Sequence, residues 1–475
     1  MRRTAIVLAI SFLALCLPSL AHEVDFASHF RDKTMRVDLF HTGGMGEEIV
    51  ALDAVVSDGP WAGSRTRLID HTNLGKFMVE VIDPSTNQVI YSRGFATIHG
   101  EWETTGEART THRTFHESLR IPWPKHPVQV VLKKRSGESG FHQIWSTKID
   151  PDSRHVNPVD SEPVGRVWTL LENGPAHDKV DLLLIGEGYS AAEKNKFRRD
   201  ARRLTEALFE HEPFRSRKSD FNVRAIELTA AESGVSRPRA GKFRRSATGA
   251  QYNIFDSERY LLTYDNRALR DISSAVPYDF LEILVNEEQY GGGGIYNFQS
   301  TTSVDTEFAE YVFVHEFGHH FAALGDEYYT SSVAYETGGE THPEPWEPNI
   351  TALHDPENLK WKDLVDQDTP IPTPWPKEEY EKKSREIQAR RAELRARQAP
   401  ESELNALFRE EQEWMTAFLS SQKYSNTVGA FEGASYEPKG LYRPEVDCIM
   451  FTRDEVGFCR VCQRAITTII DQYSR

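Results

Sequence analysis

The chain has 475 residues, of which 39% are hydrophobic and 27% charged, and its formal net charge is −16. This length accommodates two or three domains, and the composition is that of a globular protein, which excludes a wholly disordered chain. An acidic surface repels phosphate backbones, so we expect no nucleic-acid partner.

The first 21 residues have the pattern of a cleaved export signal. Two arginines follow Met1, an apolar run extends from Thr4 to Leu17, and Ser19-Leu20-Ala21 has the small-x-small form of a cleavage site. The apolar run is shorter than the roughly 20 residues that a membrane-spanning helix needs. We therefore predict a mature chain that starts near His22, is exported to the periplasm or secreted, and has no transmembrane segment. Lipid attachment at Cys16 is the alternative.

Residues 22–150 are predicted to form an all-β, sandwich-like domain. Short runs rich in β-branched and aromatic residues are separated by turn sequences such as Asp83-Pro84-Ser85. The predicted strands are Lys76–Asp83, Gln88–Ser92, Thr114–Ile121, Val128–Lys134 and Phe141–Ile149. The polar segment 150–163 is the expected linker to the rest of the chain.

Residues 160–475 are predicted to form an α/β domain, because strands alternate with helices. The predicted strands are Asp181–Ile185, Phe221–Leu228 and Phe280–Val285. The predicted helices are Ser190–Glu210, opened by a capping box of Ser190 and Glu193, then Ser257–Asp271 and Thr306–Leu324. Residues 376–424 are expected to form an inserted helical hairpin that turns at Pro400. This insertion either binds a partner or is a solvated element packed on its own domain.

The strongest chemical signal is His315-Glu316-Phe317-Gly318-His319, within the last of these helices. Residues four apart on a helix point to the same side, so His315 and His319 can bind one Zn²⁺ ion. Glu316 stands beside the first histidine and can act as general base towards a water at the metal. We therefore predict one catalytic zinc ion per chain. The alternative is a helix with two structurally bonded histidines and a surface glutamate.

A third protein ligand is expected, because catalytic zinc sites usually have three and leave one position for water. A continuous helix would carry Asp326 about 10 Å along its axis from His319, too far to share the ion. We therefore expect the helix to end, with Gly325 in the left-handed conformation that folds the chain back. Asp326 is the predicted third ligand, and Glu327 is the alternative.

Four consecutive glycines at 291–294 precede the predicted helix Thr306–Leu324, which carries the histidine motif. The Lys-Ser/Thr of a phosphate-binding loop does not follow them. Because glycines let a second backbone approach closely, we predict a strand edge that pairs with an extended polypeptide substrate. Gly293, Gly294, Ile295 and Tyr296 are the predicted substrate-binding residues. A flexible loop before the helix is the alternative.

Three cysteines remain after the predicted signal, namely Cys448, Cys459 and Cys462. In an oxidising compartment we expect two of them to form a disulfide that holds the last helix, although the sequence does not identify which two. A redox-active pair of Cys459 and Cys462 is the alternative, but no thioredoxin-like βαβ pattern surrounds it.

Four stretches resemble the bacterial IgA-peptidase family of secreted zinc metallopeptidases. They are ILVNEEQYGGGGIYNF at 283–298, HEFGHHFAALGDEYY at 315–329, EPWEPNIT at 344–351 and CIMFTRDEVGFCRVCQRAI at 448–466. The resemblance implies an α/β zincin fold of metzincin type. It also implies zinc held by His315, His319 and Asp326, Glu316 as catalytic base, and Met450 in a hydrophobic turn below the metal.

The chain departs from the common metzincin spacing in two ways. Ala322 stands where a glycine is usual, and the third ligand is an aspartate one residue later. The family name does not define the substrate, so immunoglobulin cleavage does not follow from the resemblance.

The predicted function is that of an exported zinc endopeptidase, with Tyr328, Tyr329 and Tyr442 as candidates for stabilising the oxyanion. Two other functions are considered. One is a protein- or glycan-binding module with a structural or lapsed zinc site, which the intact Glu316 disfavours. The other is a zinc amidase acting on cell-wall peptides, which the glycine-rich edge disfavours. The sequence leaves the oligomeric state open.

Overall fold

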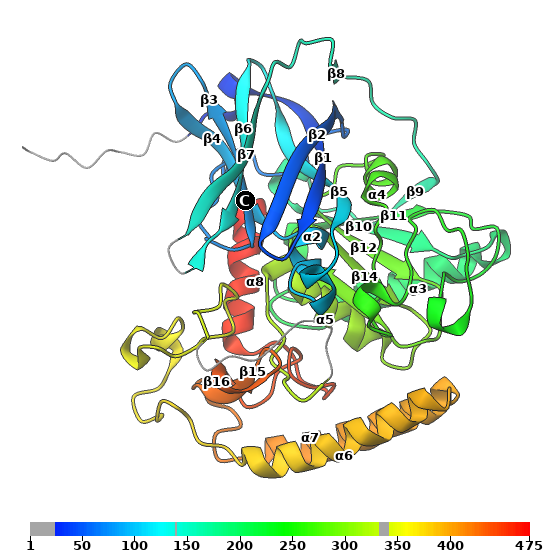
Figure 1. Ribbon diagram of the computed structural model, residues 1–475, viewed down its shortest axis with the longest axis vertical. Helices are drawn as coiled ribbons and strands as arrows, with labels where there is room; N and C mark the ends of the chain where they lie inside the picture. Colours follow the sequence, from blue (N-terminus) through cyan, green and yellow to red (C-terminus); the bar gives the residue numbers. More distant parts are fainter. Residues whose placement is uncertain (1–23, 138–139, 332–341) are drawn as a thin grey trace, which may run out of the picture.

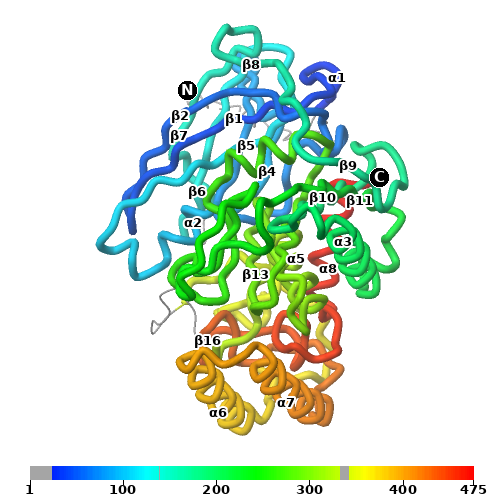
Figure 2. Tube along the Cα trace, turned by 90° about the vertical axis from the view of Figure 1, so that its right-hand side faces the viewer, coloured from blue at the N-terminus to red at the C-terminus, as the bar shows by residue number. Residues whose placement is uncertain are grey.

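The computed structural model describes residues 24–137, 140–331 and 342–475. The predicted signal at 1–21 lies outside the described residues. No helix in the described ranges is long and apolar enough to cross a membrane. Figures 1 and 2 show a β-rich part at one end of the molecule, a mixed sheet with helices in the middle, and a pair of helices at the other end.

The N-terminal part consists of two four-stranded sheets that share one hydrophobic core. The strand orders are β5-β1-β2-β8 and β4-β3-β6-β7. The elements are α1 (Phe26–His29), β1 (Phe30–Gly44), β2 (Glu47–Ser57), β3 (Phe77–Asp83), β4 (Gln88–Phe95), α2 (Ile98–Trp102), β5 (Arg113–Pro124), β6 (Val128–Arg135), β7 (Phe141–Ile149) and β8 (Val156–Asn157). Side chains from both sheets, such as Val37 and Val79, lie in the same buried cluster, which is the arrangement of a β-sandwich.

The five strands predicted for this part are present, but the long hairpin β1–β2 was not predicted. Charged residues interrupt the apolar alternation of β1, and two of them, Arg36 and Asp38, are buried. Arg36 Nε lies 2.9 Å from Asp38 Oδ1, and Arg36 Nη1 lies 3.2 Å from Asp58 Oδ1. Buried charges require such partners. Because Asp58 lies outside β1, the local sequence does not reveal that this strand is buried.

A six-stranded mixed sheet forms the centre of the remaining part. Its order is β13-β14-β12-β10-β11-β9, in which the four inner strands are parallel and both edge strands are antiparallel to their neighbours. The strands are β9 (Arg166–Leu171), β10 (Val180–Glu187), β11 (Phe221–Glu227), β12 (Phe280–Val285), β13 (Gly292–Ile295) and β14 (Gln299–Ser303). β10 and β12 are buried along their whole length, as expected for continuous apolar runs.

Helices cover both faces of this sheet. They are α3 (Lys194–Leu208), α4 (Asn266–Ser273), α5 (Ala309–Ala322) and α8 (Arg460–Tyr473). Leu204 of α3 and Phe317 of α5 belong to the buried cluster on one face, whereas Leu269 of α4 belongs to the cluster on the other. The capping box of Ser190 and Glu193 is confirmed, and it opens a short 3₁₀ turn that continues as α3.

The predicted helix Ser257–Asp271 is wrong over its first half, because α4 begins only at Asn266. Tyr260 instead forms a β-bridge with Gly292, at the outer edge of β13. An unpaired strand edge offers peptide groups that need hydrogen-bond partners, and the segment before α4 supplies some of them. This long-range pairing outweighs the local preference for a helix.

Two antiparallel helices, α6 (Lys377–Ala396) and α7 (Glu401–Ser420), lie in the segment predicted as a helical hairpin, and Pro400 directly precedes α7. Leu404 and Phe408 of α7 pack against Phe308 and Val312 at the start of α5. The helix pair therefore packs against the element that carries the histidine motif. A small hairpin of β15 (Phe431–Ala434) and β16 (Glu437–Arg443) follows α7.

Candidate metal centre

The helix that carries the histidine motif, α5, ends earlier than predicted, and a different residue takes the left-handed conformation that ends it. α5 ends at Ala322, and Ala323 takes the left-handed conformation with φ of 56°. Gly325 was expected in that role, so this expectation is wrong. Gly325 is required for packing instead, because a Cβ there would lie 2.8 Å from Ile350 Cγ1. Asn349 holds the loop by accepting from Gly325 N at 2.7 Å and donating to Gly325 O at 2.9 Å.

The structure brings the two histidines and Asp326 together. Asp326 Oδ1 lies 3.1 Å from His315 Nε2 and 3.2 Å from His319 Nε2, and the two Nε2 atoms are 3.2 Å apart. Ligand atoms about 2.1 Å from one tetrahedral zinc ion are separated by about 3.4 Å. These three side chains therefore fit a single zinc ion with one coordination position left over. The carboxylate of Glu327, the alternative ligand, lies instead among Cys448, Cys459 and Cys462.

Each histidine is oriented by its other ring nitrogen. His315 Nδ1 lies 2.9 Å from the carbonyl oxygen of Ile449, and His319 Nδ1 donates to the carbonyl of Leu324. A carbonyl can only accept, so both Nδ1 atoms carry a proton, and in the neutral form of each ring Nε2 is the nitrogen that can bind a metal. The hydroxyl of Tyr436 donates to Asp326 Oδ2, which leaves Oδ1 directed at the histidines.

The electrostatics of the cluster suit a cation. Burial raises the pKa of Asp326, but the neighbouring His319 and His315 outweigh burial and hold it well below its ordinary value. Burial lowers the pKa of His319, but the charge and hydrogen bond of Asp326 raise it to about 9. A positive charge is therefore favoured between these side chains, and a bound metal ion can replace the proton.

Glu316 lies beside this cluster and against strand β13. One carboxylate oxygen of Glu316 lies within 4.8 Å of the ring nitrogens that His315 and His319 offer to a metal. Burial raises the pKa of Glu316, and the two histidines partly offset that effect. A Cβ at Gly292 would lie 2.9 Å from Glu316 Cγ, and a Cβ at Gly294 would lie 2.2 Å from Glu316 O. The glycines thus allow β13 to pack directly on the helix face that carries the motif.

The free edge of β13 is shorter than the sequence suggests. Gly292 N donates to Arg259 O, and Gly292 O accepts from Leu261 N, both at 3.2 Å. The carbonyl of Tyr296 accepts from Ala96 N at 2.9 Å. In an antiparallel pair, the N–H and C=O groups of every second residue point away from the partner strand, so those of Gly294 point the same way as those of Gly292. Gly294 is therefore the residue between these two contacts whose N–H and C=O point away from β14.

A cleft of about 590 Å³ contains the histidines, Glu316 and Asp326. All three parts of the molecule line it. The residues that line it include Ala96, Glu101 and Thr104 from the N-terminal part, the four predicted substrate-binding residues Gly293, Gly294, Ile295 and Tyr296, and Ser384, Gln388, Gln412 and Met415 from α6 and α7. The helical hairpin therefore forms one wall of the cleft.

One of the three candidate tyrosines lines the cleft. Tyr328 does so, and its hydroxyl accepts from Arg259 Nη2 at 2.9 Å. Tyr329 and Tyr442 are not among the residues that line the cleft. Arg259 and Tyr436 were not predicted as site residues. They lie far from the histidine motif in the sequence, on segments without a motif of their own, so no local signal could identify them.

Met450 is fully buried directly beneath α5, the helix that carries the histidine motif. A Cβ on Gly318 of α5 would lie 3.0 Å from Met450 Sδ, so the missing side chain at 318 makes room for the methionine. The carbonyl of Met450 accepts from Glu327 N at 2.9 Å. This turn therefore supports the loop that carries Asp326, in addition to the contact of Ile449 with His315.

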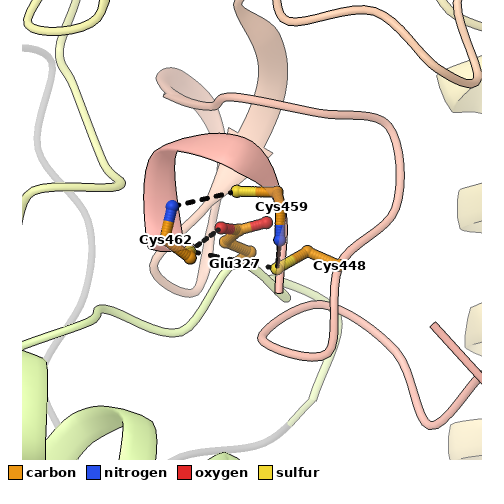
Figure 3. Close-up of side chains that lie close together, drawn as sticks. All are labelled: Glu327, Cys448, Cys459 and Cys462. Atoms are coloured by element: carbon orange, nitrogen blue, oxygen red, sulfur yellow. Dashed lines mark hydrogen bonds between the residues drawn. The ribbon is translucent and has the colours of Figure 1, made fainter. Parts of the chain in front are cut away.

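The three cysteines are buried free thiols that lie around Glu327 (Figure 3). Cys448 Sγ and Cys462 Sγ are 3.9 Å apart. A disulfide joins sulfurs at about 2.05 Å, which is shorter than this separation. A disulfide between two of the three cysteines therefore stays a prediction. Burial raises the pKa of Cys448 and of Cys462 well above the ordinary value of a thiol.

Comparison with known families gives two matches. The model of the family described as IgA Peptidase M64 matches residues 168–470, and that of the Peptidase M64 N-terminus matches residues 25–146. No curated protein matches the chain.

Proposed function

The chain belongs to the IgA peptidase M64 family, and from that premise we propose that it is an exported, zinc-dependent endopeptidase. Membership of a peptidase family indicates hydrolysis of a polypeptide. The observation that carries the finer proposal is the convergence of His315 Nε2, His319 Nε2 and Asp326 Oδ1 within 3.2 Å, beside Glu316 in one cleft. Export rests on the N-terminal sequence, with a mature chain from about His22.

We propose a zincin fold of metzincin type for residues 160–475, preceded by a β-sandwich domain at 22–150. The antiparallel edge strand β13 packs against α5, which carries both histidines, and the turn at Met450 lies beneath that helix. These features support the fold assignment that the sequence resemblance implies.

His315, His319 and Asp326 would hold a zinc ion, which would supply Lewis acidity to the peptide carbonyl and to a water molecule. Glu316 removes the proton from the attacking water and delivers it to the leaving amine. The raised pKa of its carboxylate, caused by burial, suits a group that both accepts and returns a proton. The Glu316 carboxylate already lies beside the two histidines, so the site needs little rearrangement for this step.

The substrate is an extended polypeptide segment in this proposal. Gly294 lines the cleft and its N–H and C=O point away from β14, so a peptide strand can add to β13 at that position. Tyr328 is the donor that we assign to the oxyanion, because Arg259 occupies the acceptor side of its hydroxyl and leaves the proton to point elsewhere.

The experiment compares wild-type protein with Glu316→Gln on a mixture of folded and unfolded proteins that includes immunoglobulins. Fragments are identified by mass spectrometry, and bound zinc is measured in both samples. We expect the wild type to cut and the variant to retain zinc while losing about 100- to 10,000-fold in rate. Glu310→Gln is the matched control, because Glu310 is on the same helix but ion-pairs with Arg203 and does not line the cleft.

Zinc-loaded wild type that cuts no protein would contradict endopeptidase activity. A digest of cell-wall peptides would then test the amidase, and a binding screen with the β-sandwich domain would test the binding module.

A further inference from the structure

A second group of possible metal ligands lies apart from the histidine motif. Glu327, Cys448, Cys459 and Cys462 are all buried, and their ligand atoms lie within 4.8 Å of one another. Figure 3 shows the four side chains pointing toward one another, from the loop after α5, the turn before Met450 and the first turn of α8. The proposed catalysis uses none of these side chains.

The distances match those expected between ligands of one ion. Two sulfurs at 2.3 Å from a tetrahedral zinc are about 3.8 Å apart, and a sulfur and an oxygen ligand are about 3.6 Å apart. Cys448 Sγ lies 3.9 Å from Cys462 Sγ, and Cys462 Sγ lies 3.4 Å from Glu327 Oε1.

Backbone donors surround the sulfurs. Cys459 N donates to Cys448 Sγ at 3.3 Å, and Cys462 N donates to Cys459 Sγ at 3.4 Å. Cys459 is the N-cap residue of α8, so its sulfur also lies at the positive end of a helix dipole. Such donors and such a dipole favour thiolates, which are the form that binds metal.

Glu327 is incompletely satisfied by protein groups. Its Oε1 accepts from Asn349 Nδ2 at 2.9 Å, while its Oε2 is buried and has no hydrogen-bond partner in the described part of the chain. Leaving a buried carboxylate oxygen unpaired is costly. A cation among the three sulfurs and this carboxylate removes that cost.

We propose that Glu327, Cys448, Cys459 and Cys462 bind a second zinc ion, in a closed four-ligand site that serves structure and not catalysis. Three thiolates favour a thiophilic ion such as Zn²⁺ over Mg²⁺ or Ca²⁺. The site joins the loop of Asp326 to the Met450 turn and to the start of α8. It therefore holds Asp326 in position at the first centre, which is the proposed zinc site of His315, His319 and Asp326. The proposal stands whether or not the chain is a peptidase.

The first test counts thiols and metal in the purified mature protein. Thiols are titrated with Ellman's reagent in denaturant and chelator, and zinc is measured by mass spectrometry. We expect three thiols and two zinc ions per chain. One thiol per chain means that two cysteines form a disulfide and overturns the proposal, and three thiols with a single zinc ion bound to nitrogen and oxygen also overturn it.

The second test isolates the new site. The double variant His315→Ala/His319→Ala removes the first centre and leaves the cysteines intact. We expect it to retain one zinc ion, with sulfur neighbours at about 2.3 Å in X-ray absorption. Co²⁺ in its place should give a thiolate-to-metal charge-transfer band. Absence of both signals from the folded double variant overturns the proposal.

Discussion

Asp326 and Glu327 are consecutive residues whose carboxylates point into two different clusters. Asp326 Oδ1 lies 3.1 Å from His315 Nε2, whereas Glu327 Oε1 lies 3.4 Å from Cys462 Sγ. The left-handed residue Ala323 ends α5, and in the loop that follows these two neighbouring side chains reach different clusters. One short loop thus serves both clusters, so a disturbance of either should be measurable at the other.

Tyr436→Phe should weaken metal binding at the histidines. The variant removes the hydroxyl that donates to Asp326 Oδ2 and fixes the carboxylate. Loss of such a partner typically costs about 10–100-fold in metal affinity. Competition with a fluorescent chelator measures this. Tyr442→Phe is the control, since Tyr442 does not line the cleft. Equal affinities in the two variants would contradict the role of Tyr436.

Tyr328→Phe should lower kcat by about 100-fold with little change in KM, because an oxyanion donor acts mainly in the transition state. The matched control is its neighbour Tyr329→Phe. The Tyr329 hydroxyl is buried without a hydrogen-bond partner in the described part of the chain, so its removal should cost little. Steady-state kinetics on a peptide identified from the cleavage experiment gives both parameters. A larger loss in Tyr329→Phe would shift the assignment.

Gly294→Ala should impair both stability and activity. The added Cβ would lie 2.2 Å from the backbone oxygen of Glu316 and 3.0 Å from His319 Cβ, and a backbone contact cannot be relieved by a rotamer change. We expect a destabilisation of about 1–3 kcal/mol and a displaced Glu316. Gly457→Ala serves as control, since only His211 Nδ1 lies near, at 3.7 Å. Thermal unfolding and cleavage assays report the two effects.

Metal uptake by the first centre should release a proton near neutral pH. In the metal-free protein Asp326 outweighs burial and raises the pKa of His319 to about 9, so this imidazole is protonated below that pH. Binding requires the neutral ring, and apparent affinity should therefore rise up to about tenfold per pH unit towards pH 9. Calorimetry in buffers of different ionisation enthalpy counts the protons. Zinc binding at pH 7 without proton release would contradict this.

His41 should make the stability of the β-sandwich depend on pH. Burial opposes its charge, but Glu117 and Glu48, each 3.0 Å away, raise its pKa to about 9. Because this value lies above that of an unfolded histidine, about 6.5, the stabilisation is complete below pH 6.5 and is lost as pH rises through 9. We expect a loss on the order of 1–3 kcal/mol across this window.

Thermal unfolding of wild type and His41→Gln between pH 6 and 9.5 measures this contribution. The variant should lose less stability across the window than the wild type does. His112→Gln, at an exposed histidine on the same part of the chain, should behave as wild type. Parallel curves for wild type and His41→Gln would show that the buried ion pairs contribute nothing.

Local sequence patterns were sufficient to predict a structural feature where that feature depends on a single segment of the chain. The apolar runs of β10 and β12 indicate strands buried on both faces, and the Ser190–Glu193 capping box is complete within four residues. The spacing of His315 and His319 is likewise fixed by the helix repeat. Each of these features depends on neighbours in the chain, so the sequence alone carries it.

Features that depend on contacts between distant segments were not predictable. The buried charges of β1 need Asp58, the segment before α4 pairs with Gly292 instead of forming a helix, and Tyr436 reaches Asp326 across 110 residues. The sequence by itself determined the histidine helix, the inner strands β10, β11 and β12 of the central sheet, and the family resemblance. The tertiary structure alone decided which tyrosines line the cleft and at which residue the chain turns back after α5. The reason is that side-chain periodicity is a local property, whereas the position of a loop after a helix depends on everything packed around it.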